Sequence, residues 1–448
     1  MKIRKILSAL LFAAVLVCAL CACSNSNGFS GGEVLSDGYK RSDDVSKTYN
    51  FNDGAEDLPS AYNSYANLIT GYELKLFRAL AADSSEPFAF SPACNALDLS
   101  LIANGAKGDT LSEIMLALGT DLSLENLNAC SSYFKSRLEA VSKIGENKTD
   151  ELSGKKLSEG SAAKIDFDSA LLFNSRTDVR TAFLQSNADF YGDDIVRLDF
   201  SNENAVSSLS ALFGGNSAAN KTALDKASSL VSESSVGFSD LWLNPYAADD
   251  IYEGKFADKT AEFMKSDESF IQSSTARGII KYTAKNPLKL VLIMPNEDIE
   301  FESYAKTFDS VEYMKLLDSF SVTSRASASV PQFEIPAFDE PFAMSGVMKK
   351  SGLYTLFSDS TDFGSLAHSS ELVLGEMYEL RQGFCLNRDG IFTSAEKPSE
   401  SSVSQPRENP ADSGSGKAEE LVFDRPFIFM VIDNESNIPV YMGVCSKI

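Results

Sequence analysis

Histidine is nearly absent from this sequence, whose 448 residues contain one histidine, His368, and one tryptophan. A Ser-His-Asp hydrolase needs a histidine base beside its nucleophile. His368 would have to be that base, but its loop-like context, Ala-His-Ser-Ser, predicts a surface residue. The sequence also lacks a complete phosphate-binding glycine loop. We therefore expect no enzyme active site, no cofactor and no metal site.

Cysteine is also scarce beyond the N-terminal region. After Cys23 only four cysteines remain, and no two of them form a close Cys-x-x-Cys pair: Cys94, Cys130, Cys385 and Cys445. This spacing excludes a zinc ribbon and a thioredoxin-type redox motif. Four scattered buried thiols are expected in place of a disulfide framework.

Positive charge is in short supply. The chain has 40 Lys and Arg against 63 Asp and Glu, which gives a formal net charge of −23. Nucleic acid would meet net repulsion, and no Lys/Arg stripe is visible in the sequence. An apolar content of 44% with 10% aromatics is enough to bury a large core. The chain is therefore predicted to be globular, without a nucleic-acid partner.

The N-terminus has the build of a secretory signal. A basic start precedes an apolar run over residues 6–20, and small residues precede Cys23. The segment Leu20-Cys21-Ala22-Cys23 resembles the bacterial lipobox, in which the signal is removed before a cysteine that carries lipid. We expect Cys23 to be lipidated and to anchor the exported protein at the extracellular face of the bacterial cell membrane. An ordinary signal peptide cut near Ala22 is the alternative.

The segment after the lipobox is predicted to be a flexible tether. It is rich in Ser, Asn, Gly and Asp and has no sustained hydrophobic period. No later stretch reaches the roughly 18 uncharged apolar residues that a membrane-spanning helix needs. The predicted organisation is a signal peptide over residues 1–22, a surface tether over 23–64 and one folded domain over 65–448.

Helical patterns open the folded domain. Over residues 67–80, apolar side chains recur every four positions, which predicts an amphipathic helix. A second helix is predicted within 108–119, with Thr110 as its cap, Glu113 reaching back to it and Gly119 ending it.

Strand patterns dominate the later part of the domain. Residues 288–295 form a continuous apolar run that predicts a strand buried on both faces. Residues 426–445 predict two strands joined at 433–437. Helices first and strands later, with little β-α alternation, favour an α+β fold in one large domain.

Four blocks of sequence together resemble the serpin family. In chain order they are FAFSPACNALDLSLIANGAKGDTLSEIMLALG, LKLVLIMPNED, VPQFEIPAFDEPFAMSGVMKKSGLYTLFSDSTDFGSLA and FDRPFIFMVIDNESNIPVYMGV. The resemblance covers roughly residues 65–446 and is weaker between about 145 and 285. It implies an α+β, serpin-like single large domain with three β-sheets, about nine helices and an exposed reactive loop, at about residues 390–421.

The resemblance also implies a function. In serpins a protease cleaves the reactive loop and forms an acyl-enzyme, and the freed loop then inserts into the central sheet and drags the protease with it. This chain would be a monomeric, single-use inhibitor of a serine or cysteine protease, and it would need no cofactor. The alternative is a non-inhibitory, serpin-fold binding or scaffold lipoprotein whose loop is only a protease-sensitive linker.

The resemblance assigns a hinge to the start of the loop, formed by Gly390, Ile391, Thr393, Ser394 and Ala395. Insertion buries alternate side chains in a packed sheet, so the inward set should be small. Ile391 is bulky for such a position. Two further residues of the loop are unfavourable, because burying Lys397 without a partner would be costly and Pro398 has no N–H for the ladder.

The cleavage site is expected further along the loop. The distance from Gly390 to Phe423 is longer than the family generally spans, so counting does not locate the scissile bond. Arg407-Glu408 is the first candidate for a trypsin-like protease, and Lys417-Ala418 is the second.

The resemblance further assigns a region where the central sheet opens. It comprises Ser91, Pro92, Cys94 and Leu380. Cys94 stands where the family usually has a serine and Leu380 where it usually has a histidine. The loss of these polar partners is expected to change how the sheet opens.

Overall fold

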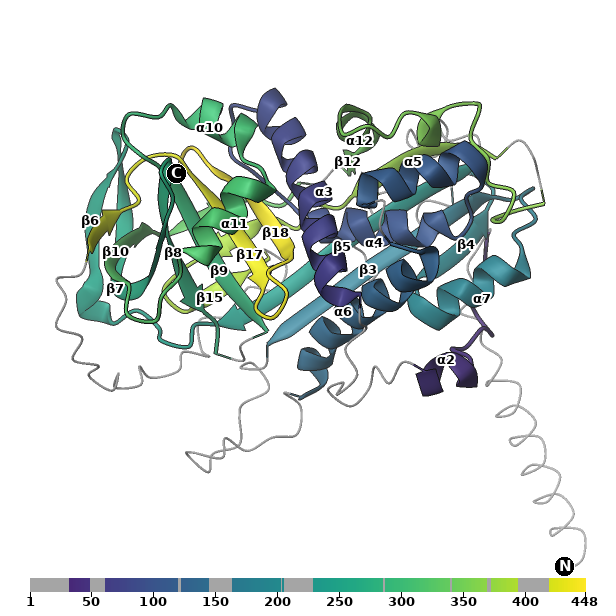
Figure 1. Ribbon diagram of the computed structural model, residues 1–448, viewed down its shortest axis with the longest axis horizontal. Helices are drawn as coiled ribbons and strands as arrows, with labels where there is room; N and C mark the ends of the chain where they lie inside the picture. The colour runs from purple at the N-terminus through teal and green to yellow at the C-terminus, as the bar shows by residue number, and fades with distance from the viewer. Residues whose placement is uncertain are drawn as a thin grey trace, which may run out of the picture.

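The computed structural model describes residues 32–48, 61–119, 122–144, 163–202, 204, 229–284, 287–338, 341–368, 372–393 and 419–448. Figure 1 shows an elongated molecule in which α3 crosses between two β-sheet regions. Helices α4 to α7 cover one face of the sheet that contains β3, β4 and β5.

Nine α-helices lie in the described ranges, in agreement with the number predicted. They are α2 (Asp43–Thr48), α3 (Tyr62–Asp83), α4 (Pro92–Ala103), α5 (Gly108–Leu118), α6 (Leu124–Ile144), α7 (Thr181–Phe190), α10 (Phe301–Thr307), α11 (Ser310–Asp318) and α12 (Ser345–Lys350). The helices predicted within residues 67–80 and 108–119 are confirmed as α3 and α5.

The first sheet region is a nine-stranded network. Its main path, in spatial order, is β1 (Gly32–Val34), β4 (Asp194–Leu198), β3 (Lys164–Asn174), β5 (Leu230–Leu241), β15 (Gly390–Phe392), β14 (Phe384–Leu386) and β11 (Phe333–Ile335). Beside this path β13 (Leu374–Glu379) pairs with β5 and with β12 (Phe342–Ala343). Strand β5 therefore borders β13 along one part of its length and β15 along another.

The second sheet region is also a nine-stranded network. Its path is β16 (Glu419–Val422), β10 (Arg325–Pro331), β7 (Lys259–Gln272), β8 (Ala276–Tyr282), β9 (Leu288–Pro295), β17 (Phe427–Asp433), β18 (Pro439–Cys445) and β2 (Phe88–Phe90), and β6 (Ile251–Phe256) also pairs with β7. The long strand β7 pairs with β6 over residues 259–264, with β10 over 263–269 and with β8 over 269–272, so it joins two smaller sheets. The three predicted sheets are therefore linked into two hydrogen-bonded networks. Strands β9, β17 and β18 confirm the late strands predicted from the sequence.

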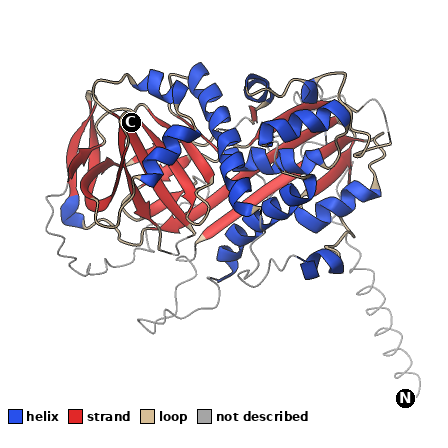
Figure 2. Cartoon of the chain, viewed as in Figure 1, coloured by secondary structure: helices blue, strands red, loops and turns tan. Residues whose placement is uncertain are grey.

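Helix α4 lies at the centre of the core. All twelve of its residues are buried. A helix that is buried all round belongs inside the molecule, and α4 packs against α3, α5, α6, β5 and β18. Figure 2 shows the helices in front of the strands in this half of the protein.

The predicted capping box of α5 is wrong. The helix begins at Gly108 with Lys107 before it, so Thr110 lies inside the first turn. The Asp362 N–H donates to Thr110 Oγ1 at 2.8 Å. The Glu113 carboxylate accepts from the backbone N–H groups of Thr355 and Leu356. Both side chains bind a distant loop, which the local pattern does not reveal.

Part of the predicted tether packs on the domain. Strand β1 extends the sheet by pairing with β4, and Glu33 forms an ion pair with Arg197 at 2.6 Å. Arg41 donates to the Asp189 carbonyl oxygen at 2.8 Å, and the Ser42 N–H donates to the Asp189 carboxylate. Residues 32–48 therefore cover the edge of the first network.

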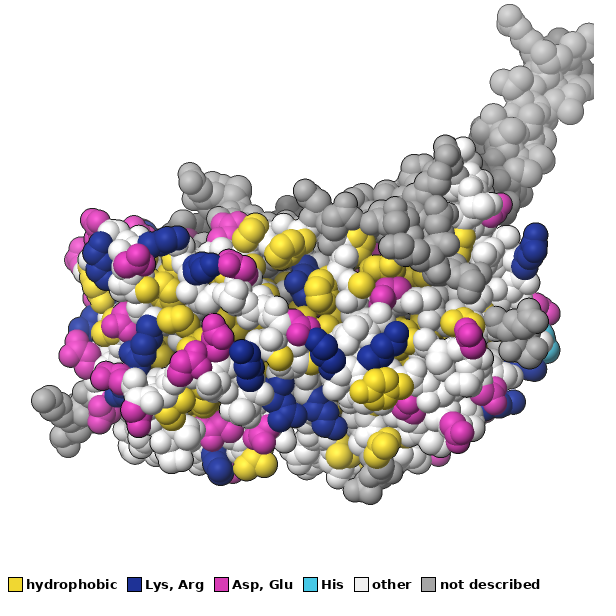
Figure 3. Space-filling view, turned by 90° about the horizontal axis from the view of Figure 1, so that it is seen from above, with side chains coloured by type: hydrophobic (Ala, Val, Ile, Leu, Met, Phe, Trp, Pro, Cys, Tyr) yellow, Lys and Arg dark blue, Asp and Glu magenta, His cyan; other side chains and the backbone are white. Residues whose placement is uncertain are grey.

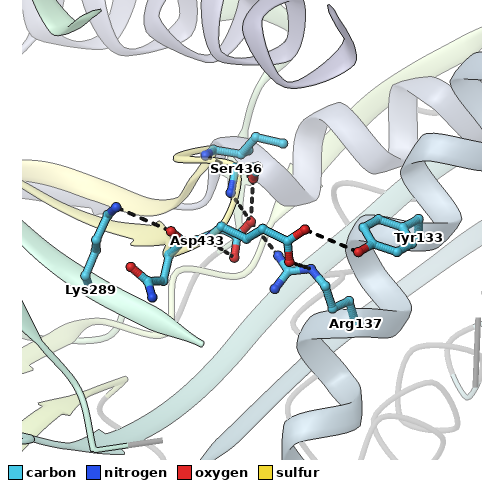
Figure 4. A network of polar contacts seen from close by, with 8 residues as sticks. Tyr133, Arg137, Lys289, Asp433 and Ser436 are labelled. Atoms are coloured by element: carbon cyan, nitrogen blue, oxygen red, sulfur yellow. Dashed lines mark hydrogen bonds and ion pairs between the residues drawn. The ribbon is translucent and has the colours of Figure 1, made fainter. Parts of the chain in front are cut away.

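A buried ion pair fixes the hairpin between β17 and β18 to α6 (Figure 4). Asp433 is fully buried and pairs with Arg137, which also reaches Glu435 at 3.2 Å. Tyr133 donates to Glu435, and Ser436 donates to Asp433 from its N–H and its hydroxyl. The residues predicted as the link between two strands thus hold the second network against α6.

Candidate functional site

The predicted hinge forms the short strand β15. It lies between β5 and β14 and is antiparallel to both. Gly390, Ile391 and Phe392 pair with residues 241, 240 and 239 of β5. Ile391, Phe392 and Thr393 are fully buried. The first residues of the predicted exposed loop are therefore inside the sheet, and Ile391 already occupies a place there.

Thr393 continues this strand by one residue. Its N–H donates to the Phe238 carbonyl oxygen at 2.9 Å, and its hydroxyl accepts from the Phe238 N–H at 3.1 Å. Beyond it, Ser394, Ala395, Arg407, Glu408, Lys417 and Ala418 lie outside the described residues. The chain is described again from Glu419, where β16 pairs with β10 of the second network.

A tight turn over residues 387–389 returns the chain into the sheet. The Asn387 side chain accepts hydrogen bonds from the N–H groups of Asp389 and Gly390. A side chain at Gly390 would clash with the carbonyl oxygen of Asp240 on β5. Glycine thus allows the close approach of β15 to β5.

The end of β5 holds this turn in place. The Trp242 indole N–H donates to the Asn387 carbonyl oxygen and its backbone N–H donates to that of Asp389, both at 2.9 Å. The Tyr246 N–H donates to the Arg388 carbonyl oxygen. The single tryptophan of the chain is buried and bonds to the turn that directly precedes the hinge.

The line along which β5 and β13 pair, called the seam below, is closed. Strand β13 runs parallel to β5, from Leu374 opposite Leu230 to Glu379 opposite Ser234. The Leu380 N–H donates to the Ser234 carbonyl oxygen at 2.9 Å. The sheet is thus occupied by β15 at one end and sealed by β5 and β13 at the other.

Three of the predicted sheet-opening residues, Ser91, Pro92 and Cys94, lie at the start of α4, and Leu380 directly follows β13. Ser91 caps α4, because its hydroxyl accepts from the Cys94 N–H, and it donates to the Val440 carbonyl oxygen at 2.8 Å. Pro92 occupies the first turn of α4, and Cys94 is buried without a disulfide. The Ser91 N–H donates to Glu379 Oε1 at 2.5 Å.

Glu379, one residue before Leu380, is the side chain that reaches α4 from β13. The sequence comparison pointed to Leu380, but side chains alternate along a strand and Glu379 contacts Ser91. Glu379 is 3% exposed, and its Oε2 has no hydrogen-bond partner. Burial raises the pKa of Glu379 to about 7, although Arg381 and the Ser91 N–H oppose the shift.

Asp98 is the second acid at the seam, and only its place in an apolar helix could have singled it out in the sequence. One of its oxygens accepts from Ser169 on β3 at 2.6 Å and the other accepts from Ser232 on β5 at 2.9 Å. Burial raises the pKa of Asp98 to about 6. Two buried carboxyl groups therefore lie on either side of the line where β5 and β13 would part.

The other sequence expectations concern absences and the surface. Within the described ranges no group of three His, Cys, Asp or Glu side chains is placed to hold a metal ion. None of the helices described is long and apolar enough to cross a membrane. His368 is exposed beside Arg180 and Lys107 in a surface hollow. Cys23 lies outside the described residues.

The site is thus built around β15, a short strand held between β5 and β14. Comparisons with known proteins identify the class to which the chain belongs. The family model Serpin (serine protease inhibitor) matches residues 68–448, so the chain belongs to the serpin family. It is 23% identical to the mouse leukocyte elastase inhibitor A over 414 residues, which cover 84% of this chain and 98% of that protein.

Two solved structures show the same fold. Native tengpin, a thermophilic serpin, has a TM-score of 0.73 at 23% identity and is matched over 93% of this chain and all of its own. Human thyroxine-binding globulin, solved with its hormone, has a TM-score of 0.64 at 15% identity over 86% of this chain and 98% of its own. At such identities the likeness concerns the fold alone.

Proposed function

We propose that this protein is a serpin-type peptidase inhibitor that acts once, as a suicide substrate for a serine or cysteine protease. The observation that carries the proposal is the place of β15, because residues 390–393 already bond to β5 and β14 inside the sheet. The first four residues of the predicted hinge and loop therefore already lie in the sheet as a strand, which supports insertion of the rest. After cleavage, further insertion would part β5 from β13 and carry the attached protease along.

The protein would act as a monomer at the bacterial cell surface, held by lipid on Cys23. Its partner would be a protease. A nucleic-acid partner is not expected, because a net charge of −23 repels phosphate groups. On the face shown in Figure 3, acidic and basic side chains are interspersed, as on an ordinary protein surface. Arg407-Glu408 is the first candidate for the scissile bond, and Lys417-Ala418 is the second.

The second candidate function is a binding or scaffold protein of the same fold. The fold likeness to thyroxine-binding globulin favours it, since that structure holds a hormone. The composition of the loop also favours it, because Pro398 has no N–H to offer to the ladder of an inserted strand.

Incubation with a panel of serine and cysteine proteases separates the two functions. An inhibitor forms a covalent complex that survives denaturing electrophoresis, together with cleaved protein whose melting temperature is raised by the inserted strand. Mass spectrometry of the released C-terminal fragment locates the cut. A protein that is cleaved by every protease without complex and without added thermal stability would establish the scaffold function.

A further inference from the structure

The pairing of β15 with β5 sets where each later residue of the loop would lie in the inserted state. Position 390 pairs with 241, 391 with 240 and 392 with 239, and Thr393 bonds to Phe238. Each step along the loop moves one residue back along β5. In this register Lys397 would lie opposite Ser234, four residues beyond Thr393. Ser234 is the residue that now pairs with Glu379.

The side chain of Lys397 would then point toward α4. Residues two or four apart on a strand share a face, so Lys397 shares the face of Thr393, and Ser234 that of Ser232 and Phe238. Ser232 on this face donates to Asp98 of α4 at 2.9 Å. The Phe238 ring lies 5.4 Å from the ring of Tyr441, inside the core.

Two buried acids stand at that position. Glu379 reaches it from β13 and Asp98 from α4, and both are at most 3% exposed. Glu379 Oε2 is buried and accepts no hydrogen bond. Arg381 also attracts Glu379, but its guanidinium stacks 3.4 Å from the centre of the Phe342 ring. An ammonium group arriving between β5 and β13 would therefore meet an acceptor that is still open.

We propose that Glu379 and Asp98 form a receiving site for the ammonium group of Lys397 in the loop-inserted state. The proposal rests on the proposed function, because it requires the loop to insert after cleavage. It gives Lys397 a partner in the inserted strand, whereas the sequence alone presents Lys397 as a buried charge without one. Burial of a lysine is tolerated when a carboxylate pairs with it. The raised pKa values of the two acids are those of a site that lacks its cation before insertion.

The test compares cleaved and uncleaved protein in four variants of the full mature chain: Lys397→Met, Glu379→Gln, the double variant and Lys417→Met. Arg407-Glu408 is the expected trypsin cut, and the Lys397-Pro398 bond resists trypsin. Lys417→Met is the matched control, because the register ends the inserted strand near residue 401, opposite Leu230. Lys397→Met lies in the loop, so it leaves the folding of the uncleaved domain intact.

We expect Lys397→Met to lower the melting temperature of the cleaved form by about 5 °C and that of the uncleaved form by less than about 1 °C. Lys417→Met should change neither. The effects of Lys397→Met and Glu379→Gln on the cleaved form should not add, because each removes the same pair. Reductive methylation read by mass spectrometry should label Lys397 at least about tenfold more slowly after cleavage, with exposed Lys306 as the internal reference.

Two results would overturn the proposal. They differ in whether the proposed inhibitory function is overturned as well. In the first, cleavage raises the melting temperature of the wild-type protein, but Lys397→Met behaves as Lys417→Met does and Lys397 stays reactive. The receiving site is then absent, and loop insertion stands. If cleavage raises no melting temperature in any variant, insertion itself fails, and the proposed inhibitory function falls with the site.

Discussion

At the scale of single residues, the hinge depends on the lack of a side chain at Gly390. A Cβ there would clash with the Asp240 carbonyl oxygen across the β5–β15 pairing. Gly390→Ala should therefore expel β15 from the sheet at a cost of about 1–3 kcal/mol, the usual range for overpacking. Trp242 would lose its acceptor on Asn387, so its fluorescence should shift to longer wavelength.

Gly346 provides the control for this substitution. It lies in α12, and a Cβ built there meets no atom within 4 Å. Gly346→Ala should leave the Trp242 emission unchanged and stability equal or slightly higher. Identical spectra for Gly390→Ala and wild type would show that the close approach of β15 to β5 does not depend on glycine.

Glu379 makes stability depend on pH in a defined window. Its carboxyl has a pKa near 7 in the folded protein, raised by burial from an ordinary value of 4.5. The folded state therefore holds the proton more tightly, and this stabilisation is complete below about pH 4.5 and is lost as pH rises through 7. The loss amounts to roughly 3 kcal/mol at 1.36 kcal/mol per pKa unit.

Urea unfolding between pH 5 and pH 8 measures this contribution. The free energy of unfolding of the wild type should fall more steeply with pH than that of Glu379→Gln, which cannot titrate. The difference between the two isolates Glu379, because Glu73, whose pKa burial also raises, is present in both. Parallel curves for wild type and Glu379→Gln would contradict the assignment.

At the scale of elements, the segment before the family domain contributes a strand and a helix to the fold. Strand β1 caps the edge of β4, and the Leu35 N–H donates to the Ile195 carbonyl oxygen at 2.6 Å. Deleting residues 24–48 should expose this edge, lower the melting temperature by a few degrees and speed amide exchange in β4.

Deletion of residues 24–31 alone is the matched comparison, because in the part of the chain that the structure describes the pairing with β4 begins at Gly32. This shorter deletion should preserve both the melting temperature and the slow exchange of the β4 amides. Equal exchange in the two truncated proteins would mean that β1 does not protect the edge of the sheet.

At the scale of the whole molecule, anchoring decides where the loop meets proteases. We expect the lipid on Cys23 to hold the protein to membranes, because acyl chains bury their methylenes in the bilayer. Cys23→Ala should release the protein into the soluble fraction of the producing cells, whereas Cys21→Ala, preceded by bulky Leu20, should remain bound. Membrane association of Cys23→Ala equal to that of the wild type would disprove the lipobox.

Much of the fold was readable from the sequence. Apolar runs and four-residue spacings identified α3, α5, β9, β17 and β18. These elements bury whole faces, so their apolar residues recur at a regular spacing in the sequence. The ordered blocks pointed to the serpin family, which the family model confirms over residues 68–448.

The tertiary structure decided what depends on partners distant in sequence. Thr110 and Glu113 bind a loop some 240 residues away. The helix was therefore predicted correctly, but its cap was not. Residues 32–48 look unstructured alone because their few apolar groups need the edge of β4 as a partner.

The same division applies to the candidate site. The sequence by itself determined that Ser91 precedes the helix beneath the sheet. It also predicted a hinge beginning at Gly390, which the structure shows as the first residue of β15. It did not determine that Ile391 is already inserted, or that Glu379 rather than Leu380 faces Ser91. A strand's register and the face of each of its side chains are set by pairing with other strands, and at this site the paired residues Ile391 and Asp240 are 151 positions apart.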